Sequence, residues 1–255
     1  MLKNGKNFTK FNRKKKLTTL ITGASRGIGL DIARHFLAKD HNLVLLVKNK
    51  ADEEKLKKKL NNKTITIISG DLSEEKIFKK IEKKNLKINN LINNAAVADK
   101  NHFLKVNIKK LEKLIKINLI SVFRVAQIIS KNMVKHKIAG NIINISSQLG
   151  HVGAYNRCAY SMSKFAIEGL TRSMALDLAK FGIRVMTVCP TKTLVNKWEE
   201  LKQPKRLDLI KKKIPLKRFS TTKEIAEIVF FLTTQSASSI TGSSILVDGG
   251  WVAGK

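Results

Sequence analysis

Short continuous apolar runs alternate along this chain with longer segments in which apolar residues recur every three or four positions. Short runs bounded by turn residues predict buried strands, and the longer spacing predicts amphipathic helices. We expect strands at residues 17–21, 43–47, 64–69, 91–92, 140–145, 183–189 and within 240–250, with helices at 51–63, 108–136, 159–181 and 225–232. Strands that alternate with helices predict an α/β fold, a doubly wound parallel sheet with helices on both faces.

The first strand ends in a glycine-rich turn that opens a helix. Residues 22–29 read TGASRGIG, and apolar residues follow at helical spacing. Glycines permit a sharp turn and close backbone approach, and a helix N-terminus presents free N–H groups to a pyrophosphate, so the turn predicts a Rossmann-like dinucleotide site. The residues expected to contact the cofactor here are Gly23, Ser25, Arg26, Gly27, Ile28 and Gly29.

The end of the second strand bears on the choice between NAD and NADP. A carboxylate there would bind the 2′-hydroxyl of the adenosine ribose and repel a 2′-phosphate. The chain instead has Val47-Lys48-Asn49-Lys50, without an acid. Lys48 and Arg26 can both pair with a phosphate. We therefore predict that NADP(H) is preferred over NAD(H), although Lys48 can also be a chance occurrence in so lysine-rich a chain.

Two later strand ends add candidate cofactor contacts. Asp71 and Leu72 follow the third strand, where a carboxylate can accept a hydrogen bond from the adenine amino group. The alternative role for Asp71 is to cap a helix that begins near Ser73. Asn94 and Ala95 follow the fourth strand, where small residues would let a cofactor ribose lie against the backbone.

Residues 144–166 contain the candidate for proton-transfer chemistry. The fifth strand ends at Ser146 and Ser147, and Tyr160 and Lys164 stand four apart on one face of the next helix. The ordinary pKa of a tyrosine phenol is about 10, and an ammonium group close to it lowers that pKa. The phenol can then give up and take back a proton near neutral pH. Taken alone, this spacing is common and usually means a packed tyrosine and a solvated lysine.

Asn118 lies among apolar residues in the segment 108–136. A buried asparagine needs hydrogen-bond partners, so it serves either the structure alone or a catalytic water.

Taken together, residues 17–251 resemble the short-chain dehydrogenase/reductase family. Six features occur in the family's order, with NNAA where the family usually has NNAG: TGASRGIG at 22–29, Asp71, NNAA at 93–96, Asn118, Ser147 with YSMSK at 160–164, and VDGG at 247–250.

This resemblance implies an enzyme that interconverts a carbonyl and a secondary alcohol by hydride transfer with a nicotinamide cofactor. Tyr160 would be the general acid in reduction and the base in oxidation. Lys164 would bind the nicotinamide ribose and favour the phenolate form of Tyr160. Ser147 would hold the substrate oxygen, and Asn118 would anchor a water in the proton relay.

The end of the sixth strand departs from the family pattern. The family often has Pro-Gly there, with a threonine five residues after the proline that contacts the nicotinamide carboxamide. Here Thr191 follows Pro190, and Val195 stands at the threonine position. We expect Thr191 or Thr193 to make this contact, and the alternative is a loss of cofactor affinity.

The chain is also similar to 3-oxoacyl-thioester reductases and to sugar or polyol dehydrogenases of the gluconate 5-dehydrogenase kind, so the expected substrate is a 3-oxoacyl thioester or a sugar-type keto compound. The residues expected around this substrate are Ser147, Gln148, His151, Arg157, Lys192 and Trp198. Their basic character hints at an anionic substrate, but lysine is abundant throughout the chain.

The net charge is +31, from 50 Lys and Arg against 19 Asp and Glu. Such a charge can indicate nucleic acid or anionic lipid, but the lysines are spread through every helical segment, which favours a compositional origin. We do not expect nucleic-acid binding. Two alternative functions remain open: a catalytically impaired dehydrogenase-fold protein with a binding or regulatory role, and a polyanion-binding protein.

Length and composition indicate one domain over residues 17–255. Before it lies a basic extension at 1–16, which we expect to be mobile or loosely docked. The alternative is a tail for organelle targeting or surface binding. Residues 191–217 have mixed periodicity and two prolines and predict a lid over the cofactor.

Cys158 and Cys189 offer neither a disulfide framework nor metal-ligand spacing, so we expect no metal and a cytoplasmic location. No apolar run is long enough for a membrane span. The family resemblance further implies a homotetramer, or a dimer, through the helical segments 108–136 and 159–181.

Overall fold

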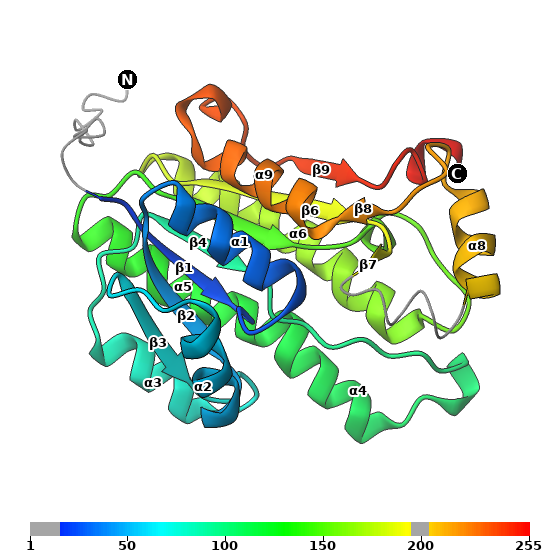
Figure 1. The fold of residues 1–255 in the computed structure, drawn as a ribbon, viewed down its shortest axis with the longest axis horizontal. Helices are drawn as coiled ribbons and strands as arrows, with labels where there is room; N and C mark the ends of the chain where they lie inside the picture. The colour runs from blue at the N-terminus through cyan, green and yellow to red at the C-terminus, as the bar shows by residue number, and fades with distance from the viewer. Residues whose placement is uncertain (1–15, 195–203) are drawn as a thin grey trace.

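The computed structural model describes residues 16–194 and 204–255 and contains a seven-stranded, fully parallel sheet (Figure 1). The strand order is β3-β2-β1-β4-β5-β6-β9. The strands are β1 (Thr18–Thr22), β2 (Asn42–Val47), β3 (Ile65–Ser69), β4 (Asn90–Asn93), β5 (Asn141–Ile145), β6 (Arg184–Pro190) and β9 (Ser244–Val247). The expected α/β fold is therefore confirmed, with strand boundaries mostly within one or two residues of the predicted ones.

Helices cover both faces of this sheet. The described helices are α1 (Gly27–Ala38), α2 (Lys50–Lys59), α3 (Glu75–Lys83), α4 (Ile108–Ile115), α5 (Ser121–Lys135), α6 (Cys158–Ala179), α8 (Pro204–Lys213) and α9 (Thr222–Thr233), of which α4 and α8 lie outside the two sheet cores. One hydrophobic core joins the sheet to α1, α2 and α9, and a second joins it to α3, α5 and α6. Figure 1 shows α1 and α9 side by side across one face of the sheet.

The strand order reverses between β1 and β4, which are hydrogen-bonded neighbours with Leu20 opposite Leu91. The chain leaves β1 toward β2 and β3 on one side, and it continues from β4 through β5 and β6 on the other. In doubly wound sheets the crevice beyond the carboxyl ends of strands at such a reversal is where ligands bind. Here that crevice lies between the turn after β1 and the segment after β4.

The long helical segment expected at 108–136 is not a single α-helix. It divides into α4, a π-helical turn at Lys116–Ile120 and α5. The π turn contains Asn118, the polar residue that interrupts the apolar pattern of the sequence. π turns inside helices occur frequently at functional sites.

The segment predicted as a lid, 191–217, contains a short strand β7 (Thr193–Leu194), which pairs with β8 (Ser220–Thr221), and then α8. Leu207 of α8 packs with Ile214 and Phe219 in a small hydrophobic cluster that is separate from the two sheet cores. Residues 1–15 and 195–203, among them Val195 and Trp198, lie outside the described part of the chain. Within the described residues, no helix combines the length and apolarity that a bilayer crossing requires.

Candidate active site

Two adjoining cavities form a groove along the carboxyl ends of the strands. The first, of about 630 Å³, lies against the glycine turn, and the second, of about 850 Å³, lies against the ends of β5 and β6 and the start of α6. Ile28, Asn94 and Ala96 line both cavities, so the two are continuous at the point where the strand order reverses. A groove of this length suits a dinucleotide with a substrate at one end.

The glycine turn packs so tightly against the end of β4 that side chains are excluded. A Cβ atom on Gly23, where φ is +67°, would lie 2.8 Å from the Cα of Ala95, and one on Gly29 would lie 2.4 Å from the carbonyl oxygen of Gly23. The Asn94 side chain donates to the carbonyls of Thr22 and Gly23 at 3.0 and 3.1 Å. Asn94 therefore fixes the turn, and the turn presents bare backbone to the first cavity, as a pyrophosphate site requires.

Charged residues meet in the part of the first cavity that lies beyond β2 and β3. Arg26, Lys48, Asp52 and Asp71 all line it, and Lys48 Nζ lies 3.8 Å from an Asp71 carboxylate oxygen. Burial raises the pKa of Asp71, but hydrogen bonds from Ser73 and the charge of Lys48 outweigh this effect and hold the pKa below its ordinary value. Asp71 is therefore ionised near neutral pH.

The two roles considered for Asp71 are compatible. One of its oxygens accepts from the backbone N–H and the hydroxyl of Ser73, at 2.9 and 2.7 Å, so it orders the turn before α3. The other oxygen faces Lys48. Asp52 was not among the residues expected from the sequence, because it belongs to a helix rather than to a strand end.

Helix α6 brings Tyr160 and Lys164 to the second cavity from one face, as the spacing predicted. Both residues line the cavity, and Lys164 Nζ lies 5.6 Å from the centre of the Tyr160 ring. The Lys164 side chain is only 3% exposed and donates to the carbonyl of Ile145 at 2.8 Å. Because an ammonium has three N–H donors, further donors remain for a ligand. This lysine is not the solvated residue that the spacing alone would suggest.

The serine after β5 faces the same cavity. Ser147 Oγ accepts from the backbone N–H of Leu149 at 3.2 Å and lines the cavity with Tyr160. Since this oxygen is used as an acceptor, its proton remains available for an external oxygen. A hydrogen bond of 2.9 Å from Asn144 to Thr171 ties β5 to α6, so the strand that carries Ser147 and the helix that carries Tyr160 are held in a fixed relation.

Asn118, on the π turn, is buried and lines neither of the two cavities. Its side chain accepts from the Val97 N–H at 2.8 Å and donates to the Val97 carbonyl and the Ser163 hydroxyl, at 2.9 and 3.2 Å. Ser163 in turn donates to the carbonyl of Tyr160 at 2.7 Å. The amide protons of Asn118 are thus fully used in joining the segment after β4 to α6.

The end of β6 forms another wall of the second cavity. Pro190, Thr191 and Thr193 line it. The hydroxyl of Thr193 donates to the Thr191 carbonyl at 3.2 Å, whereas the hydroxyl of Thr191 is buried and has no hydrogen-bond partner among the described residues. A buried hydroxyl without a partner costs free energy unless a ligand satisfies it.

The expected substrate residues separate into two groups. Gln148, Arg157 and Lys192 line the second cavity, and Arg157 donates to the carbonyl of Asp99 at 2.9 Å. His151 does not belong to this lining: its imidazole lies 3.8 Å from Glu168, between α6 and β6. Residues that the sequence analysis did not identify also line the cavity, namely Lys100, Arg206, Leu207, Ile210, Lys213 and Trp251.

Comparison with known proteins agrees with this geometry. A family model described as enoyl-(acyl carrier protein) reductase matches residues 23–252. The chain is 31% identical over 238 residues to carbonyl reductase (NADPH) 2 of Sus scrofa, which is 93% of this chain and 97% of that protein. It is 35% identical over 243 residues to the 3-oxoacyl-(acyl-carrier-protein) reductase FabG of Aquifex aeolicus, which is 91% of this chain and 96% of that protein.

The structure is also similar to a solved 3-oxoacyl-(acyl-carrier-protein) reductase from Brucella melitensis. The TM-score is 0.86 and the sequence identity 26%, with 93% of this chain and 92% of that chain covered. The family match spans nearly the whole described structure, including both cavities. This chain therefore belongs to the short-chain dehydrogenase/reductase family of oxidoreductases.

Proposed function

We propose that this protein is an NADP(H)-dependent oxidoreductase that interconverts a carbonyl compound and a secondary alcohol. The observation that carries the proposal is the continuous groove, in which the glycine turn lies in one half and Tyr160, Lys164 and Ser147 line the other. When bound, the nicotinamide cofactor would supply the hydride. The bare backbone at Gly23 and Gly29 fits its pyrophosphate. The Thr191 hydroxyl, which has no partner in the described part of the chain, fits a polar group at its nicotinamide end.

In this proposal Tyr160 donates a proton to the carbonyl oxygen in reduction and removes it in oxidation. The free proton of Ser147 makes a second hydrogen bond to the same oxygen, and the remaining donors of Lys164 bind the ribose hydroxyls. The Lys164 ammonium also places a positive charge 5.6 Å from the centre of the Tyr160 ring. Because the Asn118 side chain is fully used, we propose that a relay water is held by main-chain carbonyls of the π turn around it.

The preference for NADP(H) is supported by the charges beyond β2. Arg26 and Lys48 line the cavity where the adenosine ribose would lie, and the strand end carries no carboxylate. The name of the Sus scrofa relative also specifies NADPH. The carboxylates of Asp71 and Asp52 line the same cavity and would partly offset the attraction of Arg26 and Lys48 for a 2′-phosphate. We therefore expect both Arg26 and Lys48 to be needed for the NADP(H) preference.

We expect the double variant Arg26→Ala/Lys48→Ala to bind NADPH roughly 10- to 100-fold more weakly, because charge-assisted hydrogen bonds to the 2′-phosphate are lost. The dissociation constant of NADH should change little. Titration of cofactor fluorescence measures both constants. Lys50→Ala is the matched control, since Lys50 is exposed and does not line the cavity. Equal weakening of NADH and NADPH would contradict the assignment.

We propose that Thr191 replaces the threonine missing at position 195 as the contact to the nicotinamide carboxamide. Thr191→Val should weaken NADPH binding about 2- to 10-fold, the range for one lost hydrogen bond, and leave the affinity for adenosine 2′,5′-bisphosphate unchanged because that fragment lacks nicotinamide. Thr193→Val is the control, since its hydroxyl is already bonded within the chain. If Thr193→Val weakened NADPH binding more than Thr191→Val did, Thr193 rather than Thr191 would be the contact to the carboxamide.

The substrate we propose is a 3-oxoacyl thioester or a sugar-type keto compound, with an anionic group. Arg157 and Lys213 line the second cavity, and no Asp or Glu does among the described residues. A panel of carbonyl compounds assayed with NADPH and NADH tests the function directly. Turnover of anionic keto compounds ahead of neutral analogues of the same size supports the proposal. Turnover of none, despite NADPH binding, would favour the impaired-enzyme alternative.

We further propose a homotetramer, or a dimer, through α4, α5 and α6. Exposed apolar side chains gather on these helices and the π turn, namely Ile108, Ile120, Phe123, Met162, Phe165 and Leu176. Gly169 of α6 also faces open space, which would permit close approach of a second copy. Light scattering in solution measures the mass of the assembly. We propose a cytoplasmic location, supported by two cysteines that are both free.

A further inference from the structure

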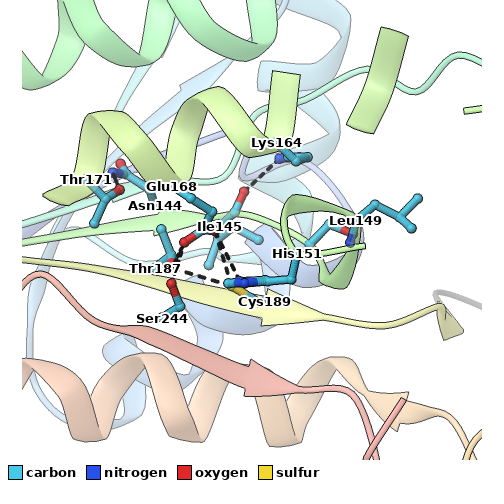
Figure 2. Close-up of polar contacts among 11 residues, drawn as sticks. Asn144, Ile145, Leu149, His151, Lys164, Glu168, Thr171, Thr187, Cys189 and Ser244 are labelled. Carbon is cyan, nitrogen blue, oxygen red and sulfur yellow. Dashed lines mark hydrogen bonds and ion pairs between the residues drawn. The ribbon is translucent and has the colours of Figure 1, made fainter. Parts of the chain in front are cut away.

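A cluster of polar side chains lies between α6 and the strands β5 and β6, outside the lining of the two cavities. His151, Glu168 and Cys189 offer one ligand atom each, and these atoms all lie within 4.8 Å of one another. Figure 2 shows the three side chains converging from the loop after β5, from α6 and from β6. Glu168 is only 4% exposed and Cys189 is fully buried. A buried carboxylate without a cation requires an explanation.

The two oxygens of Glu168 have different surroundings. Oε2 accepts hydrogen bonds from the hydroxyls of Thr187, at 2.9 Å, and Ser244. Oε1 accepts a hydrogen bond from the Cys189 thiol at 3.4 Å, and His151 Nε2 lies 3.8 Å from the same oxygen (Figure 2). One oxygen is therefore anchored by hydroxyl donors, and the other points toward a thiol and an imidazole nitrogen.

Two buried polar atoms beside this oxygen are unsatisfied. His151 Nε2 and Ser146 Oγ have no hydrogen-bond partner in the described structure. The Ser146 hydroxyl is close to the cluster, since it lies 3.0 Å from the position of a Cβ on Gly150, which is itself 3.1 Å from Glu168 Cγ. Orphaned polar atoms of this kind indicate a missing ligand.

We propose that His151 Nε2, Glu168 Oε1 and Cys189 Sγ bind a divalent cation of the zinc class, with the Ser146 hydroxyl or a water as the fourth ligand. Nitrogen, carboxylate oxygen and thiolate are the donors that zinc prefers, and tetrahedral bond lengths put neighbouring donor atoms about 3.4–3.6 Å apart. Two of the three separations here are 3.4 and 3.8 Å. The third, between sulfur and nitrogen, is at most 4.8 Å and needs a modest closure.

The surroundings of the cluster support a bound ion. Ligating carboxylates are ordinarily oriented by further hydrogen bonds, and Thr187 and Ser244 provide them here. The His151 side chain is 19% exposed, but its Nε2 is buried, so the imidazole would have to move for an ion to enter. Burial and the charge of Glu168 raise the pKa of the Cys189 thiol to about 12 in the metal-free chain, which opposes binding at neutral pH, so metal uptake should strengthen as the pH rises. Binding would therefore transfer the thiol proton to solvent as the thiolate bonds to the metal.

Such an ion would join the three elements that carry the catalytic groups. His151 follows Ser147 in the loop after β5, Glu168 lies one turn after Lys164 on α6, and Cys189 precedes Pro190 at the end of β6. The ion would therefore fix Ser147 relative to Tyr160. This inference departs from the expectation of no metal, which relied on ligand spacing along the sequence.

The test uses the full-length chain without an affinity tag, in a Cys158→Ser background, so that Cys189 is the one thiol. Cobalt(II) and zinc(II) are the probes, added alone after removal of metal by a chelator. We expect about one cobalt per chain, with the thiolate-to-cobalt charge-transfer band and the intense visible bands of a tetrahedral site. Zinc should displace the cobalt, and the melting temperature should rise with zinc concentration.

His151→Ala and Cys189→Ser are expected to remove the charge-transfer band and most of the bound metal. His102→Ala, on an exposed histidine, is the control and should bind as the parent does. Should Cys189→Ser fail to fold, the absorption of the parent still identifies a thiolate ligand. An absence of cobalt absorption in the folded parent chain would overturn the proposal, as would tight binding that persists in both cluster variants.

Discussion

Tyr160→Phe is expected to lower kcat for carbonyl reduction by about 10²- to 10⁴-fold, the usual contribution of a positioned general acid. The ring remains, so the packing of α6 should not change. The dissociation constant of NADPH should stay close to that of the parent, because the role we propose for the lost hydroxyl is a hydrogen bond to the substrate oxygen. Single-turnover kinetics at saturating cofactor measure the chemical step directly.

Tyr155→Phe is the matched control for this variant. Tyr155 also borders the second cavity, but it is 100% exposed and has no lysine four residues later. We expect it to keep nearly full activity. A Tyr160→Phe protein that retained most of its turnover would exclude the proposed proton donor, and a Tyr155→Phe protein with the larger loss would indicate that the wrong tyrosine had been identified.

Lys164→Met is expected to have the second largest effect, with kcat reduced by about 10²-fold or more and NADPH bound more weakly. Methionine has a similar length, so the buried space is filled, but the ammonium that we propose to bind the ribose is gone. The Ile145 carbonyl also loses its donor at 2.8 Å. Both kinetic and binding measurements are needed, because the lysine acts on tyrosine and on cofactor.

Lys180→Met controls for the removal of one positive charge near α6. Lys180 is the exposed C-cap residue of that helix and lies outside both cavities. Circular dichroism distinguishes misfolding from a specific effect in either variant. If Lys164→Met bound NADPH normally and lost no turnover, the buried ammonium would have only a structural role.

The fold could be predicted from the sequence because the two patterns that define it, short apolar runs for strands and helical spacing for helices, each lie within a short segment. Fully buried parallel strands appear as continuous apolar runs. Strands β2 and β5 each begin one residue from their predicted start and end where predicted. The boundary between α4 and α5 was not readable. The π turn depends on where Asn118 finds partners, and these are Val97 and Ser163, far away in sequence.

The candidate site was predictable where a motif has local geometry. The glycine turn and the spacing of Tyr160 and Lys164 each define one short segment, and the structure brings both to one groove. The lining by α8 was not predictable, because Arg206 and Lys213 reach the cavity through the packing of Leu207 against Phe219. The misassignment of His151 has the same origin, since only the tertiary structure turns it toward Glu168 and Cys189.

A crystal structure of the chain with NADPH bound tests the central claim most directly. We predict the pyrophosphate on the backbone of Gly23 to Gly29, the 2′-phosphate beside Arg26 and Lys48, and the nicotinamide in the second cavity. The hydroxyls of Tyr160 and Ser147 should then both lie within roughly 3–3.5 Å of one point above the hydride-bearing carbon. A nicotinamide ring outside that cavity, or a Tyr160 hydroxyl directed away from it, would contradict the account.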